Sequence, residues 1–252
     1  SLTSATILNR SAAIGDEEYD VFSDGPSSLV IRGYSGSTAE TYAAEADLDF
    51  EALSSLITGT CGENVTYSLD IISGALTLSG ARDMADYAYG EAPWYDEREA
   101  VKSVVIEDGV AKIGSEAFSD CTELISVTVP GSAANIENAG FESCSNLQRI
   151  DVSDAHPAYS SDDGVLFNKD RSALLLCPAG REGVYAIPDG VTSLGAYAFC
   201  GCAGLTEITI PNGVTRIGYG AFYGCSGLTR AVMPDSVTSL GAHAFNGCSG
   251  LA

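Results

Sequence analysis

Cysteine and histidine are the residues of this 252-residue chain best suited to metal, redox or nucleophilic chemistry, and it has eight and two of them. Five of the cysteines follow a Phe by three positions and precede a Leu by three. Unpaired Cys is among the most buried residue types, so this shared spacing predicts an internal column of free thiols. A bridge between neighbouring members remains open where the Cβ geometry allows it. The five are Cys121, Cys144, Cys202, Cys225 and Cys248.

The remaining cysteines give no metal pattern. Cys200 forms a Cys-x-Cys pair with Cys202, which is closer than the usual structural zinc pair, and no second pair lies at zinc-finger spacing. Cys61 and Cys177 stand alone. We therefore predict no metal and no cofactor.

His156 is the residue nearest to a hydrolytic constellation, because Asp154 and three further polar residues surround it in the sequence. A Ser-His-Asp triad is defined by geometry, however, and the chain has no Gly-x-Ser-x-Gly turn to present a nucleophile. We predict no catalytic residue here. The three neighbours are Ser160, Ser161 and Asp162.

His243 occupies a repeat position at which other copies have quite different residues. Such variety indicates an exposed structural position rather than a ligand or a base. The equivalent residues are Glu116, Ala139, Tyr197 and Gly220.

The charge balance excludes several partners. Lys and Arg total 12 against 34 Asp and Glu, a net charge of −22. Such a polyanion repels nucleic-acid phosphates and anionic membrane surfaces. The acidic groups Asp16–Glu18, Asp96–Glu97 and Asp162–Asp163 do not fit the calcium-loop pattern, so they are predicted to be solvated surface. No apolar run approaches the roughly 20 residues of a membrane span, which predicts no membrane insertion.

The cysteine column belongs to a repeat in which Phe, Cys and Leu keep one period. The Phe positions are separated by 23, 58, 23 and 23 residues. Several apolar columns locked to one period predict a solenoid whose coils bury their apolar faces against each other. The other two columns of the predicted core are Phe118, Phe141, Phe199, Phe222 and Phe245, and Leu124, Leu147, Leu205 and Leu228.

Each coil of about 23 residues is predicted to hold one short strand and a compact return segment. Glu207–Ile210 alternates polar and apolar residues, Pro211 ends the strand, and Asn212-Gly213 favours a turn. Such strands pair in parallel about 4.8 Å apart, and the fold class is a β-rich leucine-rich-repeat-like solenoid with short helices. One coil, 153–188, is 12 residues longer than the rest.

The longer coil is predicted to contain a β-hairpin in place of the usual return segment. Its strands would be Gly164–Phe167 and Ala173–Leu176. Insertions in solenoids map to one face, often the binding face.

Three regions are expected along the chain. Residues 1–57 would end a first repeat array, closed by a helix over about 37–47 that the capping pattern Ser37–Glu40 begins. Residues 58–100 would form a hairpin and an aromatic segment that cap the next array, and 101–252 would be that array. Both termini fall inside repeats, which predicts unpaired strand edges and end-to-end self-association of a fragment.

These motifs resemble the BspA-like leucine-rich repeats of bacterial surface proteins. The coil around Phe22 and Gly25 departs from the pattern, since these residues replace the Cys and a position near the Leu. The resemblance implies a secreted or surface-attached bacterial protein with roles in adhesion and protein binding, and it transfers no catalytic residue. The segments that carry it are Ile187–Phe199, Gly201-Cys202, Val214–Gly218, Gly224-Cys225, Cys61–Leu69, Ala92–Tyr95 and Gly33–Tyr42.

The leading hypothesis is therefore a non-enzymatic binding module that offers an extended surface to an extracellular protein. A carbohydrate-binding accessory module of a surface enzyme and a structural spacer remain alternatives. Tyrosine suits both protein and sugar contacts because its ring is apolar and its hydroxyl polar. The predicted contact residues, in or after the longer coil, are Tyr159, Phe167, Tyr185, Tyr197, Tyr219 and Tyr223.

Overall fold

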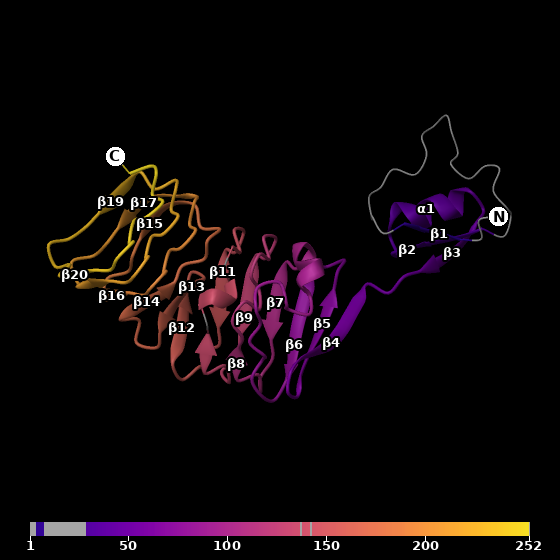
Figure 1. Ribbon diagram of the computed structural model, residues 1–252, viewed down its shortest axis with the longest axis horizontal. Coiled ribbons are helices and arrows are strands. Elements are labelled where there is room, and N and C mark those ends of the chain that lie inside the picture. The colour runs from indigo at the N-terminus through magenta and orange to yellow at the C-terminus, as the bar shows by residue number, and fades with distance from the viewer. Residues whose placement is uncertain (1–3, 8–28, 137, 142, 252) are drawn as a thin grey trace. The chain divides into compact units, whose positions relative to one another are not determined.

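The computed structural model describes residues 4–7, 29–136, 138–141 and 143–251 (Figure 1). The chain divides into two compact units, Ser1–Ile57 and Thr58–Ala252. The predicted coil with Phe22 and Gly25, and the acidic group Asp16–Glu18, lie outside the described residues.

The first unit is a three-stranded parallel sheet in the order β1-β2-β3, with one helix, α1 (Thr38–Glu45). Its core is built from Leu29, Ile31, Ala39 and Ala43. The helix begins where the capping pattern predicts, but the cap differs: Ser37 Oγ makes no capping bond, and Glu40 accepts from Gly36 N–H instead. The strands are β1 (Ser4–Ile7), β2 (Val30–Gly33) and β3 (Asp49–Ala52).

The second unit begins with a ladder of strands that lie side by side in Figure 1, in the order β11-β9-β7-β6-β5-β4. The predicted hairpin is present as the antiparallel pair β5 and β6, and the later pairs of this ladder, β6-β7, β7-β9 and β9-β11, are parallel. The strands are β4 (Leu56–Gly62), β5 (Val65–Asp70), β6 (Ala75–Gly80), β7 (Ser103–Ile106), β9 (Ser126–Val129) and β11 (Arg149–Val152).

A second parallel ladder runs through the last coils in the order β15-β17-β19. Its strands are β15 (Gly183–Ala186), β17 (Leu205–Thr209) and β19 (Arg230–Val232). Because β11 and β15 belong to different sheets, the main ladder is divided at the longer coil.

Each regular coil also has a two-residue strand in its return segment, which the prediction of one strand per coil missed. Neighbouring coils approach closely here: a Cβ on Gly218 would lie 2.5 Å from the carbonyl carbon and oxygen of Gly195. Glycine at this position therefore allows the parallel pairing. The short strands are β8 (Lys112–Ile113), β10 (Asn135–Ile136), β16 (Ser193–Leu194), β18 (Arg216–Ile217) and β20 (Ser239–Leu240).

The Phe column is an internal ring stack. Phe222 lies between Phe199 and Phe245 with centroid distances of 4.9 Å on both sides. Phe118 and Phe141 stack at 5.5 Å. All of these rings are buried except Phe245, which is half-buried at the last coil, and the Cys and Leu columns are buried beside them.

No disulfide joins the eight cysteines, all of which the structure describes, and all except Cys200 are buried. From Cys144 onward, the column thiols bond to the coil before them: for example, Cys225 Sγ donates to Phe199 O at 3.0 Å and Cys248 Sγ to Phe222 O at 3.0 Å. Burial raises the pKa of Cys121 to about 12. These thiols act as small packed side chains rather than as nucleophiles.

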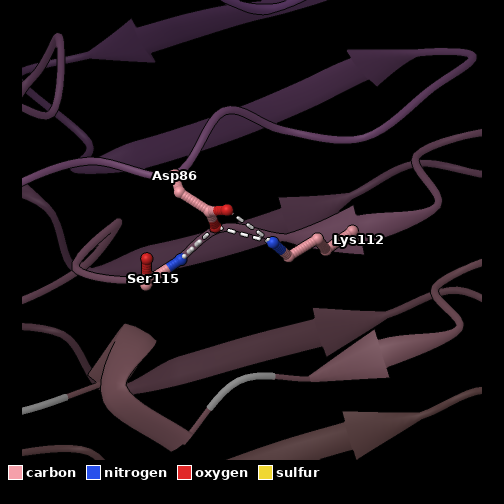
Figure 2. A network of polar contacts seen from close by, with 3 residues as sticks. All are labelled: Asp86, Lys112 and Ser115. Atoms are coloured by element: carbon pink, nitrogen blue, oxygen red, sulfur yellow. Dashed lines mark hydrogen bonds and ion pairs between the residues drawn. The ribbon is translucent and has the colours of Figure 1, made fainter.

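The leader, residues 58–100, is fastened to the first coil by aromatic and ionic contacts. Trp94 is buried, stacks on Phe118 at 5.7 Å and donates Nε1–H to Ala117 O at 2.9 Å. Figure 2 shows Asp86 accepting from Lys112 Nζ at 2.7 Å and from Ser115 N–H at 3.0 Å. Trp94 therefore extends the ring stack by one position and covers its end.

Helices in the second unit are short 3-10 turns, η1 (Tyr95–Ala100) and η2 (Asn138–Phe141). Among the described residues, no helix has the length and hydropathy needed to span a membrane.

The longer coil contains three antiparallel strands, β12 (Tyr159–Asp162), β13 (Val165–Asn168) and β14 (Ala173–Leu176). The predicted hairpin is therefore present as β13 and β14, and β12 was not predicted. Strand β14 then pairs in parallel with β16, so the inserted strands join the ladder of short strands that serves the later coils.

Candidate functional site

The backbone of the longer coil places a cysteine where regular coils have the stacked Phe. In regular coils the Phe N–H donates to the next coil, as from Phe199 to Ala221 O at 2.7 Å. Cys177 N–H donates to Ala198 O at 2.6 Å, so Cys177 holds the equivalent backbone position. Cys202 Sγ, which points back to the preceding coil like the other column thiols, lies 3.7 Å from Cys177 O. The longer coil thus interrupts the ring stack.

In a regular array, a Phe of the preceding coil would stack on Phe199. The longer coil has no such ring, and Tyr185 partly fills the space beside Phe199. Its ring centroid lies 5.9 Å from that of Phe199, and the Arg181 guanidinium lies 4.9 Å from the Tyr185 ring. Burial raises the pKa of the Tyr185 hydroxyl. The prediction that Tyr185 is a contact residue is therefore wrong: it points inward from β15, in register with the buried Ile208.

Phe167 requires the same correction, because it is 1% exposed. Its neighbours on β13, Val165 and Leu166, are buried too. Since β13 is paired on both sides, by β12 and β14, its apolar side chains serve the core rather than a surface.

A groove lies where the turn of the longer coil meets the turns of the coils on either side. Its larger part has a volume of about 710 Å³. An adjoining hollow of about 320 Å³ shares Ser145, Ala179 and Gly201 with it. Both volumes fall in the range of about 300–1,000 Å³ that small-molecule sites occupy. The larger part is lined by Phe141, Ser143, Ser145, Leu176, Ala179, Tyr197, Cys200, Gly201, Tyr219, Tyr223 and Gly224.

Three of the predicted contact tyrosines lie in this groove. Tyr197, Tyr219 and Tyr223 are 41%, 45% and 45% exposed. The rings of Tyr197 and Tyr219 are 5.4 Å apart at 71°, and Tyr219 makes a similar edge contact with His243 at 5.4 Å. Their successive coils therefore carry an exposed row of aromatic rings along the groove and beyond it.

Backbone geometry at one repeat position supports this row. Tyr197 and His243 have φ values of 57° and 59°, and the equivalent Glu116 and Gly220 share that left-handed conformation. Non-glycine residues rarely adopt this conformation. Here Tyr197 and His243 each make an edge contact with the ring of Tyr219. His243 is exposed, as its variable repeat position indicates.

His156 and Tyr159 lie away from the groove lining. His156 is fully buried: Nε2 contacts Ala133 O at 2.8 Å, and Nδ1 accepts from Ala158 and Tyr159 N–H at 3.1 Å each. Both ring nitrogens are thus engaged with backbone, which leaves neither to act as a base. Tyr159 is half-buried against the His156 ring at 4.9 Å.

Sequence reasoning missed several lining residues, among them Ser143, Ser145 and Cys200. The sequence did contain one signal, the 58-residue gap between Phe141 and Phe199. Such a gap indicates that one coil contributes no ring to the stack, so that a space can remain between the turns of the coils before and after it. The half-buried Cys200 thiol is therefore a groove residue, unlike the buried column thiols.

Charge is distributed unevenly around this site. Residues 83–123 carry eleven carboxylates against Arg98, Lys102 and Lys112. In contrast, the 70 residues 183–252 contain three carboxylates and two guanidinium groups. The larger part of the groove is lined without Asp, Glu, Lys or Arg. Within the described residues no group of three His, Cys, Asp or Glu side chains is placed to hold a metal ion.

Comparison with protein families gives one match, the "BspA type Leucine rich repeat region", in six copies over residues 94–162 and 184–252. The unmatched segment between them contains β13 and β14 of the longer coil. No curated protein matches the chain.

Several solved structures are similar to this chain, and three of them follow. A leucine-rich repeat protein from Eubacterium ventriosum is 26% identical, with 78% of this chain and 71% of that chain covered and a TM-score of 0.46. A leucine-rich cell surface protein from Faecalibacterium prausnitzii is 21% identical (77% and 81% covered, TM-score 0.44). The pneumococcal vaccine antigen PcpA is 17% identical (80% and 81% covered, TM-score 0.47). With more than half of its residues matched by the family model and its coils folded as a leucine-rich-repeat solenoid, the chain belongs to the BspA-type leucine-rich-repeat family.

Proposed function

We propose that this chain is a non-catalytic binding scaffold of a secreted or surface-attached bacterial protein and that it holds an extracellular protein ligand. The family supports this role, because leucine-rich-repeat scaffolds of bacterial surface type serve protein binding and adhesion. Solenoids present extended surfaces to which side chains from successive coils contribute.

The observation that carries the proposal is the contrast between the two sides of the main strands. The inward residues Val104, Val127 and Ile150 share one register and are all buried. The outward residues at the next register position, Val105, Thr128 and Asp151, differ in kind from coil to coil. A constant inner column with a changing outer one fits a scaffold whose outer face is adapted to a ligand.

The outward strand face, defined by Val105, Thr128 and Asp151, belongs to the acidic part of the array. A net charge of −22 favours a ligand with a basic surface and speeds its encounter at low ionic strength. The structural spacer alternative requires no such binding.

The test is a biosensor panel of extracellular matrix proteins and mucins against the whole chain, at low and high salt. We expect at least one ligand whose association slows with added salt and whose binding weakens in Thr128→Arg. The matched control, Asn212→Arg, places the same charge on an exposed turn and should bind normally. Absence of binding across the panel would contradict the proposal, as would equal binding by both variants.

A further inference from the structure

The groove at the longer coil has chemistry of its own, separate from the outward strand face. We infer that it binds a neutral oligosaccharide. This inference goes beyond the proposed protein binding and does not depend on it, because no residue is shared between Val105, Thr128 and Asp151 and the groove lining.

The tyrosines supply the apolar contact that a sugar ring needs. The carbon–hydrogen faces of a pyranose pack against aromatic rings, and a phenol hydroxyl can pair with sugar hydroxyls at the same time. The ring planes of Tyr197 and Tyr219 lie at 71° to each other, so the two rings contact a ligand in the groove from two directions. Tyr223, on the same coil as Tyr219, adds a third exposed ring to the lining.

The polar side chains that accompany the tyrosines in the lining are neutral, apart from Glu182 in the adjoining hollow. Ser143 and Ser145 supply hydroxyls in the larger part, while Asn146 and Gln148 supply amides in the adjoining hollow. Hydroxyls and amides both donate and accept, which matches the mixed donors and acceptors of sugar hydroxyls. Glycines such as Gly201 leave the backbone uncovered in both parts.

Charge selects the class of sugar. Glu182 is the ionisable carboxylate among the residues lining the two parts, and no lining residue is Lys or Arg. Recognition of sulfate, phosphate or uronate groups relies on such cations, and the net charge of −22 repels these ligands from a distance. A neutral oligosaccharide needs no cation in the lining and is not repelled by the net charge of the protein.

A peptide fits the groove less well. Extended peptides often bind by adding a strand to an open sheet edge. The strand that reaches the groove, β14, is paired with β13 on one side and with β16 on the other. The remaining lining residues come from return turns rather than from the main strands of the ladders.

The first experiment titrates the whole chain calorimetrically with neutral hexasaccharides of glucose, xylose, mannose and N-acetylglucosamine, and with a sulfated heparin hexasaccharide. We expect a neutral hexasaccharide to bind and the sulfated one not to bind. Tyr219→Ala should weaken binding about tenfold or more through the lost ring contact. Tyr89→Ala removes a still more exposed tyrosine from the leader, away from the groove, and should bind like the parent chain.

A second readout locates the sugar. Cys200 is the half-buried groove thiol while the other seven cysteines are buried, so iodoacetamide should alkylate Cys200 first in the folded protein. A saturating neutral hexasaccharide should slow that alkylation several-fold.

Three outcomes would overturn the inference: no binding by any neutral hexasaccharide, binding without protection of Cys200, or equal affinity in Tyr219→Ala and Tyr89→Ala. A peptide ligand that protects Cys200 when no sugar does would overturn it as well and assign the groove to peptides. None of these results bears on Thr128→Arg, so this inference and the proposed protein binding fail separately.

Discussion

The coils before and after the longer coil share one repeat and differ in what they present. The coils over 101–152 follow the acidic leader and are joined to it by Trp94 and by the ion pair of Asp86 with Lys112. Coils over 183–252 stack their rings at 4.9 Å, carry little charge and expose tyrosines. The buried columns thus repeat from coil to coil along the chain, while the charge and the exposed side chains differ between the two regions.

The largest expected effect compares the two ring stacks. Phe222 has ring neighbours on both sides, whereas Phe141 stacks on Phe118 and has the groove on its other side. We expect Phe222→Ala to lower the free energy of unfolding by about 3–5 kcal/mol and Phe141→Ala by about 2–3 kcal/mol. Urea denaturation measures both. Equal losses would mean that the interruption of the stack has no energetic consequence.

The second prediction tests whether Tyr185 replaces the missing ring. Tyr185→Ala should cost about 3 kcal/mol in urea denaturation, since it removes a buried ring beside Phe199. Tyr185→Phe keeps the ring and serves as the control, with little expected change. A small loss in Tyr185→Ala would show instead that the ring is dispensable and that Arg181 covers the site alone.

The third prediction concerns the leader at the other end of the first stack. Trp94→Phe leaves a smaller ring and leaves Ala117 O without the indole donor. We expect a loss of about 1–2 kcal/mol in thermal or urea unfolding. Tyr95→Phe, a nearby ring substitution that keeps the stack, is the control. A loss as large as in Phe222→Ala would place the leader inside the core rather than at its end.

The smallest effect is electrostatic. Bonds from Lys112 and the Ser115 N–H lower the pKa of Asp86 below its usual value. When the pKa of a carboxyl group is lower in the folded protein than in the unfolded chain, its charge stabilises the fold at any pH above the unfolded pKa. This stabilisation is lost as the pH falls through the folded pKa. Asp86→Asn should therefore melt slightly lower than the parent chain at pH 7, and the gap should close below about pH 4.

Asp235→Asn, an exposed aspartate of the later coils, is the matched control for that measurement. A gap that persisted unchanged in acid would show that the carboxylate charge of Asp86 does not fasten the leader.

The repeat columns could be predicted because each column residue recurs in sequence at a fixed distance. Phe222, Cys225 and Leu228 need no tertiary information to be placed in the core, and the hairpin of the longer coil follows from alternation and turn residues. Strand β12 could not be predicted in this way. Its half-buried and exposed residues carry no apolar alternation, and it forms through pairing with β13.

Part of the groove lining was among the predicted contact residues. Tyr197, Tyr219 and Tyr223 were found because they lie off the apolar columns, but the same reasoning wrongly included Tyr185. Alignment on the strand-ending prolines would have corrected it, since Tyr185 precedes Pro188 as Ile208 precedes Pro211. The groove itself depends on where Cys177 falls in the stack, which only the pairing of the longer coil reveals.

The division of the main ladder at the longer coil also bears on how the array comes apart. Stability in a repeat array is close to a sum of coil terms and nearest-neighbour terms, so cooperativity passes from coil to coil through each interface. Between β11 and β15 that coupling runs through inserted strands rather than through a shared sheet. Opening that starts at the last coils should therefore pause at this boundary, and amide exchange should divide the array there into two separately protected blocks.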